Sequence, residues 1–153
     1  MAQGDVIIYN DMKEQILKGT HNLASGGNTL KCTLHTGYTP DIDAHQVWLD
    51  TGVSTTEYGT ASGYTAGGKT LASQTVTQDD TNDRALFDCA NITWTALGPL
   101  SPATPSHAIF WNDTPTSPAD PLICYMIIGT TATNSGDYTI AISSSPAALI
   151  SLT

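Results

Sequence analysis

Positive charge is scarce in this sequence. Its 153 residues include five lysines and arginines against 14 aspartates and glutamates, so the formal net charge at pH 7 is −9. A protein that binds nucleic acid needs cations to neutralise phosphates, and one that binds an anionic membrane surface needs them for the same reason. The composition therefore predicts no nucleic-acid partner and no membrane partner.

Long apolar runs and closely spaced cysteines are also lacking. The longest apolar run, residues 122–128, is far shorter than the roughly 20 residues needed to cross a bilayer. Residues 1–9 lack the basic start and apolar core of a secretory signal. Cys32, Cys89 and Cys124 are an odd number without close pairing, so we expect reduced, buried thiols in a protein made in a cytosol.

Charged residues make up only 12% of the chain and apolar residues 40%, and serine, threonine, glycine and proline are frequent. This composition is typical of an all-β protein with many turns. The length suits a single domain, residues 1–153, with a short N-terminal arm and helix over about residues 1–20. In that helix Asp11 is the expected N-cap, Glu14 completes a capping box and Gly19 ends it.

Eight further segments show strand patterns. Residues 29–36 alternate between apolar and polar, which predicts a half-buried strand, whereas residues 106–111 and 122–128 are apolar on both faces and predict central strands. The other expected strands lie in residues 70–77, 84–88, 91–95, 138–142 and 147–152. We therefore predict an all-β antiparallel sandwich of about eight strands, for which a jelly roll is one arrangement, with one short N-terminal α-helix.

Residues 63–70, GYTAGGKT, match the spacing of a phosphate-binding loop. A true loop of this kind joins a buried apolar strand to a helix whose first amides hold the phosphates. Here the preceding segment is polar and rich in glycine, and the following one is rich in serine and threonine, which favours a strand. We predict a glycine-rich turn that enters a strand; the alternative is a nucleotide site that uses Lys69.

Other patterns for catalysis or metal binding are weak. Asp41, Asp43 and His45 would share a face in a strand and could hold a divalent metal, but Pro40 and the loop-like surroundings favour a solvated acidic turn. Residues 79–83 lack the spacing and terminal glutamate of a calcium loop. No hydrolase, zinc or redox motif is present, so we expect no enzyme, no cofactor and no small-molecule substrate.

Prolines recur at every third position on both sides of the strand expected at residues 106–111. Polyproline II has three residues per turn, so each run could form a stiff contact arm; the alternative is that prolines only end strands and protect edges. Large aromatic residues are a second kind of interface candidate, with core packing as the alternative. The candidates are Tyr9, Tyr38, Trp48, Tyr64, Pro99, Pro102, Pro105, Pro115, Pro118 and Pro121.

The order of these segments resembles small virion structural proteins of tailed bacteriophages, of the capsid decoration, cement or fibre-associated type. The resemblance spans nearly the whole chain, and in that family the segment G-Y-T-A-G-G-K-x-L recurs as a structural turn. The matching segments are residues 29–34, 38–41, 57–71, 87–88, 92–94, 108–111 and 127–129.

The resemblance implies a cement protein that binds the outside of the assembled major capsid protein shell. Its implied partners are the major capsid protein and copies of itself, a trimer being the best fit to a three-fold position. Its implied location is the virion, on the capsid surface, after synthesis in the host cytoplasm. A tail, baseplate or fibre component is an alternative, and a carbohydrate-binding module, with exposed aromatic rings and calcium at Asp41, Asp43 and His45, is an alternative of another class.

Overall fold

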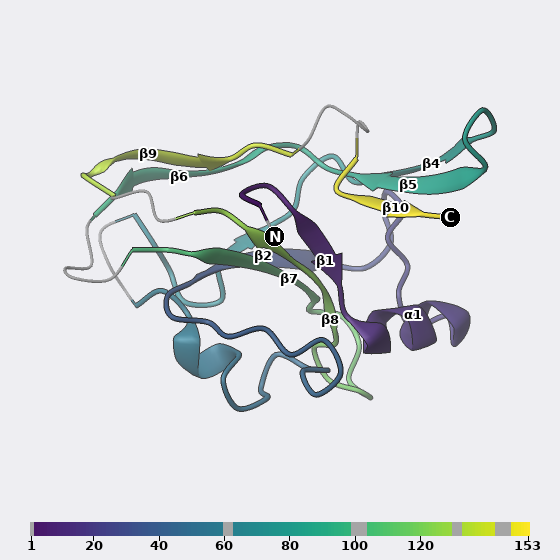
Figure 1. The fold of residues 1–153 in the computed structure, drawn as a ribbon, viewed down its shortest axis with the longest axis horizontal. Coiled ribbons are helices and arrows are strands. Elements are labelled where there is room, and N and C mark those ends of the chain that lie inside the picture. The colour runs from purple at the N-terminus through teal and green to yellow at the C-terminus, as the bar shows by residue number, and fades with distance from the viewer. Residues whose placement is uncertain (1, 60–62, 99–103, 130–132, 143–147) are drawn as a thin grey trace.

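The computed structural model describes residues 2–59, 63–98, 104–129, 133–142 and 148–153, which form antiparallel β-sheets and one short α-helix (Figure 1). The predicted all-β sandwich is confirmed at this level. The elements are β1 (Val6–Ile8), α1 (Asn10–Leu17), β2 (Leu30–His35), the 3-10 turn η1 (Ser54–Thr56), β3 (Lys69–Thr70), β4 (Thr75–Asp79), β5 (Arg84–Asp88), β6 (Ile92–Leu97), β7 (His107–Asn112), β8 (Leu122–Ile127), β9 (Gly136–Ile140) and β10 (Ile150–Leu152).

A five-stranded sheet with the order β1-β8-β7-β2-β3 forms the centre of the molecule. Its middle strands β7 and β8 are the two segments that are apolar on both faces, and almost all of their residues are buried. Each strand of the sheet runs antiparallel to its neighbours. The two segments predicted to be central strands are therefore confirmed, because only a strand covered on both faces can hide such side chains from water.

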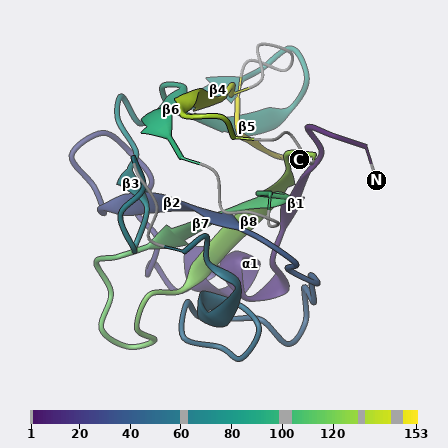
Figure 2. The ribbon, with the colours of Figure 1, turned by 90° about the vertical axis from the view of Figure 1, so that its left-hand side faces the viewer.

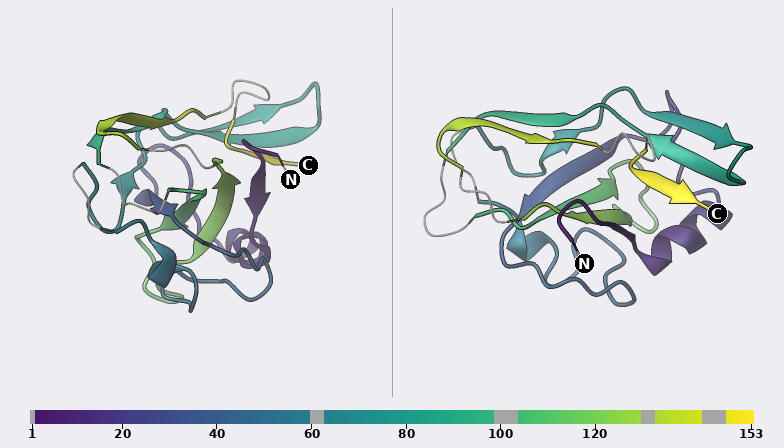
Figure 3. Two further views of the ribbon diagram at one scale, coloured as in Figure 1. Left: turned by 60° about the vertical axis from the view of Figure 1, so that its left-hand side comes forward. Right: turned by 45° about the horizontal axis from the view of Figure 1, so that its top comes forward.

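The second layer consists of two smaller sheets, β10-β5-β4 and β6-β9, which lie over one face of the central sheet (Figures 1 and 3). The opposite face is covered by α1 and by the loops between β2 and β3 (Figure 2). The described residues thus contain ten strands in sheets of five, three and two, so the two four-stranded sheets of a jelly roll are not reproduced.

Covering both faces corrects one prediction. β2 was expected to expose one side, yet only Lys31 is partly exposed and Thr33 and His35 are fully buried. The alternating pattern was correct, but the polar side faces the loop layer instead of water. There the Thr33 hydroxyl and the His35 Nε2 atom lie 2.9 Å apart, and the Thr56 hydroxyl is 3.0 Å from His35 Nδ1.

The N-terminal region differs from expectation in two ways. Residues 6–8 pair with β8 as a strand of the central sheet instead of forming a free arm. The helix begins at Asn10 with Tyr9 as its N-cap and no side-chain capping bond, so the predicted capping box is wrong. Asp11 instead accepts a hydrogen bond from Gln15 at 3.1 Å. Gly19 has a φ of +74° and follows the helix end as predicted.

Candidate functional site

The segment of residues 63–70 forms a turn that leads into β3, as the sequence analysis predicts. Gly67 and Gly68 have φ values of +84° and +68°, and Lys69 then pairs with Cys32 of β2. The residues before the turn form η1 and an isolated bridge between Glu57 and His35, not a core strand. Residues 69–98, which follow the turn and are all described, contain no helix, so the helix terminus that holds phosphates in a nucleotide loop is missing here.

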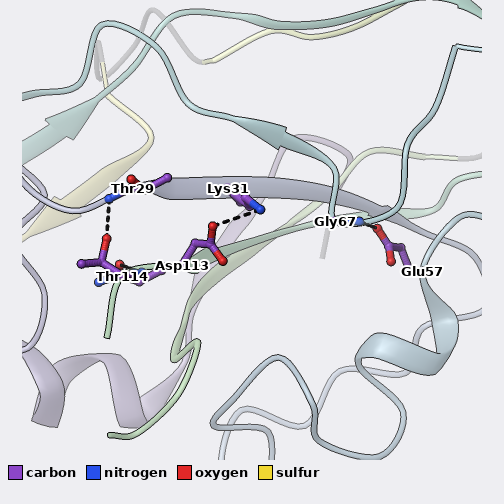
Figure 4. A network of polar contacts seen from close by, with 7 residues as sticks. Thr29, Lys31, Glu57, Gly67, Asp113 and Thr114 are labelled. Carbon is purple, nitrogen blue, oxygen red and sulfur yellow. Dashed lines mark hydrogen bonds and ion pairs between the residues drawn. The ribbon is translucent and has the colours of Figure 1, made fainter. Parts of the chain in front are cut away.

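The chain itself supplies an anion to this turn. The Glu57 carboxylate accepts a hydrogen bond from the Gly67 N–H at 2.6 Å (Figure 4). It also accepts one from the Tyr64 hydroxyl at 2.9 Å. Burial raises the pKa of Glu57, and these two hydrogen bonds act in the opposite direction by stabilising its charged form. An amide that would have to face a phosphate is therefore occupied by a carboxylate of the protein.

The nearest lysine on the neighbouring strand is also occupied. Lys31 Nζ lies 3.0 Å from a carboxylate oxygen of Asp113 and 5.2 Å from the ring centre of Trp111. Beside it the Thr29 N–H donates to the Thr114 hydroxyl at 2.7 Å (Figure 4). These contacts join β2 to the loop after β7, so this polar network stabilises the fold. Lys31 is already paired with Asp113 within the chain.

Glu57 was not among the predicted site residues. It is the only acidic residue between positions 51 and 78, a stretch that otherwise contains glycine, serine, threonine and few large side chains. A single carboxylate ahead of a glycine-rich turn is a signal that could have indicated an internal partner for the turn amides.

The aromatic interface candidates lie in the core, which corrects their assignment as surface contacts. Tyr9, Tyr38, Trp48 and Tyr64 expose 8% of their surface or less. The Tyr9 and Tyr38 hydroxyls lie 2.7 Å apart. Trp48 stacks on Trp111 with 4.9 Å between ring centres. Each ring finds its partners inside the chain, so the core-packing alternative holds for all four.

Two histidines are buried, and His35 packs against the rings of Tyr38 and Trp48. Burial lowers the pKa of His35 to about 3 and that of His21 to about 4, so both side chains are neutral near pH 7. Burial likewise raises the pKa of Tyr38 to about 12, and its hydroxyl lies 2.8 Å from His45 Nδ1. Groups with such pKa values do not exchange protons at neutral pH, and their contacts tie the loop after β2 to the central sheet.

The side chains of Asp41, Asp43 and His45 do not converge on one point. The Asp41 carboxylate accepts the N–H groups of Asp43 and Ala44 at 3.1 and 3.0 Å, which closes a local turn. Asp43 accepts a hydrogen bond from Asn10, and His45 is engaged by Tyr38. Within the described residues no three histidine, cysteine or acidic side chains gather closely enough to hold a metal ion.

The second proline run differs from the predicted contact arm, and most of the first lies outside the described residues. Pro99 and Pro102 lie outside the described residues, and Pro105 and Pro121 are buried. Around Pro118 the chain makes a tight turn, closed by a bridge between Thr116 and Ala119 and containing a cis Ser117–Pro118 bond. The second run, from Pro115, is therefore a folded turn and not an extended polyproline arm.

The three cysteines are free and buried, as predicted.

All three tryptophans and five of the six tyrosines are buried, and Tyr138 is half-buried. A carbohydrate-binding module needs an exposed ring on which a sugar can stack. The exposed aromatic platform on which that alternative depended is absent from this chain, in which every tryptophan and tyrosine is described.

The two smaller sheets of the second layer expose much of their surface to possible partners. In the hairpin of β4 and β5 four of the five β4 residues are exposed, and in β9 three of five are exposed. Figure 1 shows the β4–β5 hairpin and the β6-β9 sheet at opposite ends of the upper layer. They extend the second layer beyond the central sheet and present backbone edges to solvent.

Comparison of the chain with protein-family models, with curated proteins and with solved structures found no match. The one helix in the described part of the chain, α1, is too short to cross a membrane.

Proposed function

We propose that this chain is a structural protein of a tailed-phage virion, a capsid cement that binds the outside of the assembled major capsid protein shell. The observation that supports this most directly is that the exposed β4–β5 hairpin and the exposed two-stranded sheet β6-β9 lie at opposite ends of the second layer (Figure 1). A cement protein contacts two or more subunits at once, and two separated contact elements on one rigid body allow this. The resemblance in segment order gives the same class of protein.

The use of the polar side chains supports a role without catalysis. The carboxylate beside the glycine-rich turn, the lysine of β2 and the buried histidines all have partners within the chain. A protein of this kind acts by burying surface against its partners, which in this proposal are the major capsid protein and other copies of itself.

The net charge of −9 agrees with a position outside the shell. Packaged DNA is a dense polyanion, and a chain with this charge is repelled by it and gains nothing from releasing its counterions. The energy of binding then comes from strand edges and apolar contacts on the capsid surface, and many weak contacts made together resist outward pressure on the shell.

Purified protein added to assembled shells and to unassembled capsid protein tests the proposal. We expect saturable sedimentation with assembled shells only, and a higher temperature of shell disruption after binding. Binding to isolated tails or fibres instead would place the protein in the alternative virion structure. Binding to a glycan array that is lost on addition of a chelator would contradict both. Lys69→Ala serves as a control because its loss should leave shell binding unchanged.

A further inference from the structure

β4 forms an open edge of the three-stranded sheet β10-β5-β4, and no strand in the described ranges pairs with its outer side. Residues Thr75 to Gln78 are all exposed, and none is charged or proline. Natural edge strands are usually protected by lysine, proline, a bulge or a covering segment. This edge carries none of those residues and is rich in β-branched side chains, so it is suited to pairing with another strand.

The outward side of β4 can be assigned from its hydrogen-bond pattern. In a strand the N–H and C=O of one residue point to the same side, and the side alternates along the chain. The Phe87 carbonyl accepts from the Leu149 N–H at 2.9 Å on the β10 side, so the adjacent Leu86 faces β4. Leu86 pairs with Thr77, whose backbone groups therefore face inward. The two residues that flank Thr77 direct their backbone groups outward.

An apolar groove of about 290 Å³ adjoins this edge, and Val76 lines it with half of its surface exposed. No aspartate, glutamate, lysine or arginine lines the groove. Other lining residues are Ile16, Leu23, Phe87, Ile150 and Leu152. The outward edge of β4 and this groove, together called the β4 surface, form a continuous uncharged area on an otherwise acidic chain.

We propose that the β4 surface binds a second copy of this chain, with the two β4 strands paired antiparallel across a two-fold axis at Thr77. In this register Val76 of each copy pairs with Gln78 of the other, and these are the residues whose backbone groups face outward. The two three-stranded sheets become one continuous sheet. The side chains of Val76 and Gln78 then lie on the groove side, so the grooves of both copies lie next to each other on one face of the continuous sheet.

The positions of the charged residues around β4 favour this partner and this register. Asp79, Asp80 and Asp83 all lie at the turn end of the hairpin, and Asp79 is already bonded to Arg84 at 2.7 Å. With the axis at Thr77, Asp79 faces Thr75 of the second copy. A register shifted towards the turn would bring the acidic residues of the two copies face to face, which is unfavourable. A basic partner would gain little from this uncharged surface, whereas an identical neutral strand matches it.

Charge substitution at the axis tests the proposal in solution. We expect the wild-type chain to show a concentration-dependent dimer in sedimentation equilibrium. Thr77→Lys and Thr77→Glu each place like charges opposite one another and should weaken that dimer by at least about tenfold, whereas an equimolar mixture of the two variants should restore it. Thr95→Lys, the same change at an exposed position of β6, is the matched control and should leave the dimer unchanged.

A cysteine at the axis gives a second readout. Thr77 of the two copies would form a non-hydrogen-bonded pair with Cα atoms about 4.5 Å apart, which is within the range of a disulfide. Thr77→Cys should therefore give a covalent dimer on mild oxidation, and Thr75→Cys should not. The native cysteines are buried and do not compete.

The proposal is overturned by a wild-type chain that is monomeric at about 1 mM. It is also overturned by a trimer that persists in folded Thr77→Lys, or by equal cross-linking of Thr75→Cys and Thr77→Cys. Circular dichroism establishes that each variant is folded. These measurements use the isolated chain, so self-association and capsid binding can fail separately.

Discussion

Gly68 offers a sharp test of how the glycine-rich turn is built. A Cβ atom at this position would overlap the carbonyl oxygen of Cys32 and lie 2.8 Å from its carbonyl carbon. The clash is with the backbone of β2, and Cys32 is fully buried between β7 and β3. Because that strand cannot move without breaking the central sheet, Gly68→Ala must distort either the turn or the sheet.

The neighbouring Gly67 provides a matched control. It also has a positive φ, but the nearest atom to an added Cβ is the flexible Nζ of Lys31 at 3.9 Å. Gly67→Ala should cost only the left-handed backbone strain, about 1 kcal/mol. Gly68→Ala carries the same strain plus the backbone clash, and we expect a loss above about 4 kcal/mol, in the range of the most damaging core substitutions.

Urea unfolding followed by tryptophan fluorescence measures both variants, since Trp48, Trp94 and Trp111 are all buried. For a chain of this length, about 2–4 °C in Tm corresponds to each kcal/mol, so the loss at Gly67 corresponds to about 2–4 °C and the loss at Gly68 to about 8 °C or more. Equal losses for the two variants, or a loss at Gly68 below about 2 kcal/mol, would show that the turn does not lie against β2 as described.

Three further predictions concern pH, the buried hydroxyl pair and the turn lysine. His35 has a folded pKa of about 3 against 6.5 normally, so only the unfolded chain binds its proton between those values. The contribution of neutral His35 to the free energy of unfolding is complete above about pH 6.5 and decreases by about 1.4 kcal/mol per pH unit as the pH falls towards about 3. Urea titrations near pH 7 and pH 4.5 should therefore show a smaller loss of unfolding free energy between these two pH values in His35→Gln than in the wild-type chain. Tyr38→Phe removes the hydroxyl that lies 2.7 Å from the Tyr9 hydroxyl and should lower the unfolding free energy by about 1–3 kcal/mol. Scanning calorimetry measures this loss, and a substitution at an exposed site should not cause it. Titration calorimetry with ATP and magnesium should give no binding heat for the wild-type chain or Lys69→Ala, and a micromolar Kd lost in the variant would refute the assignment of the turn.

The positions of the central strands could be predicted because their side chains are apolar on both faces of the strand. β7 and β8 are apolar at nearly every position, and such a segment is stable only when both faces are covered. The turn at residues 63–70 could be predicted for a similar local reason, since the segments on either side match neither a core strand nor a helix start. In both cases the information lies within a few residues of the element.

The candidate site was harder to predict because it depends on distant segments. Thr33 and His35 alternate with apolar residues and so resemble a solvent-facing side, but the loop after β2 returns and supplies Thr56 as a partner. Tyr9 and Tyr38 are 29 positions apart, yet their hydroxyls meet in the core. A tyrosine looks the same in sequence whether its hydroxyl reaches water or another buried hydroxyl.

Local chemistry specified most of the strand-forming segments, although not β1, together with the single α-helix near the start, the glycine-rich turn and the acidic net charge. Periodicity and glycine content act over short ranges, and net charge follows from the whole composition. The three-dimensional arrangement specified which polar side chains are buried, which carboxylate occupies the turn amides and which strand edge is left open. These depend on contacts between residues far apart in the chain, and a contact exists only after the sheets have stacked and the loops have closed over them.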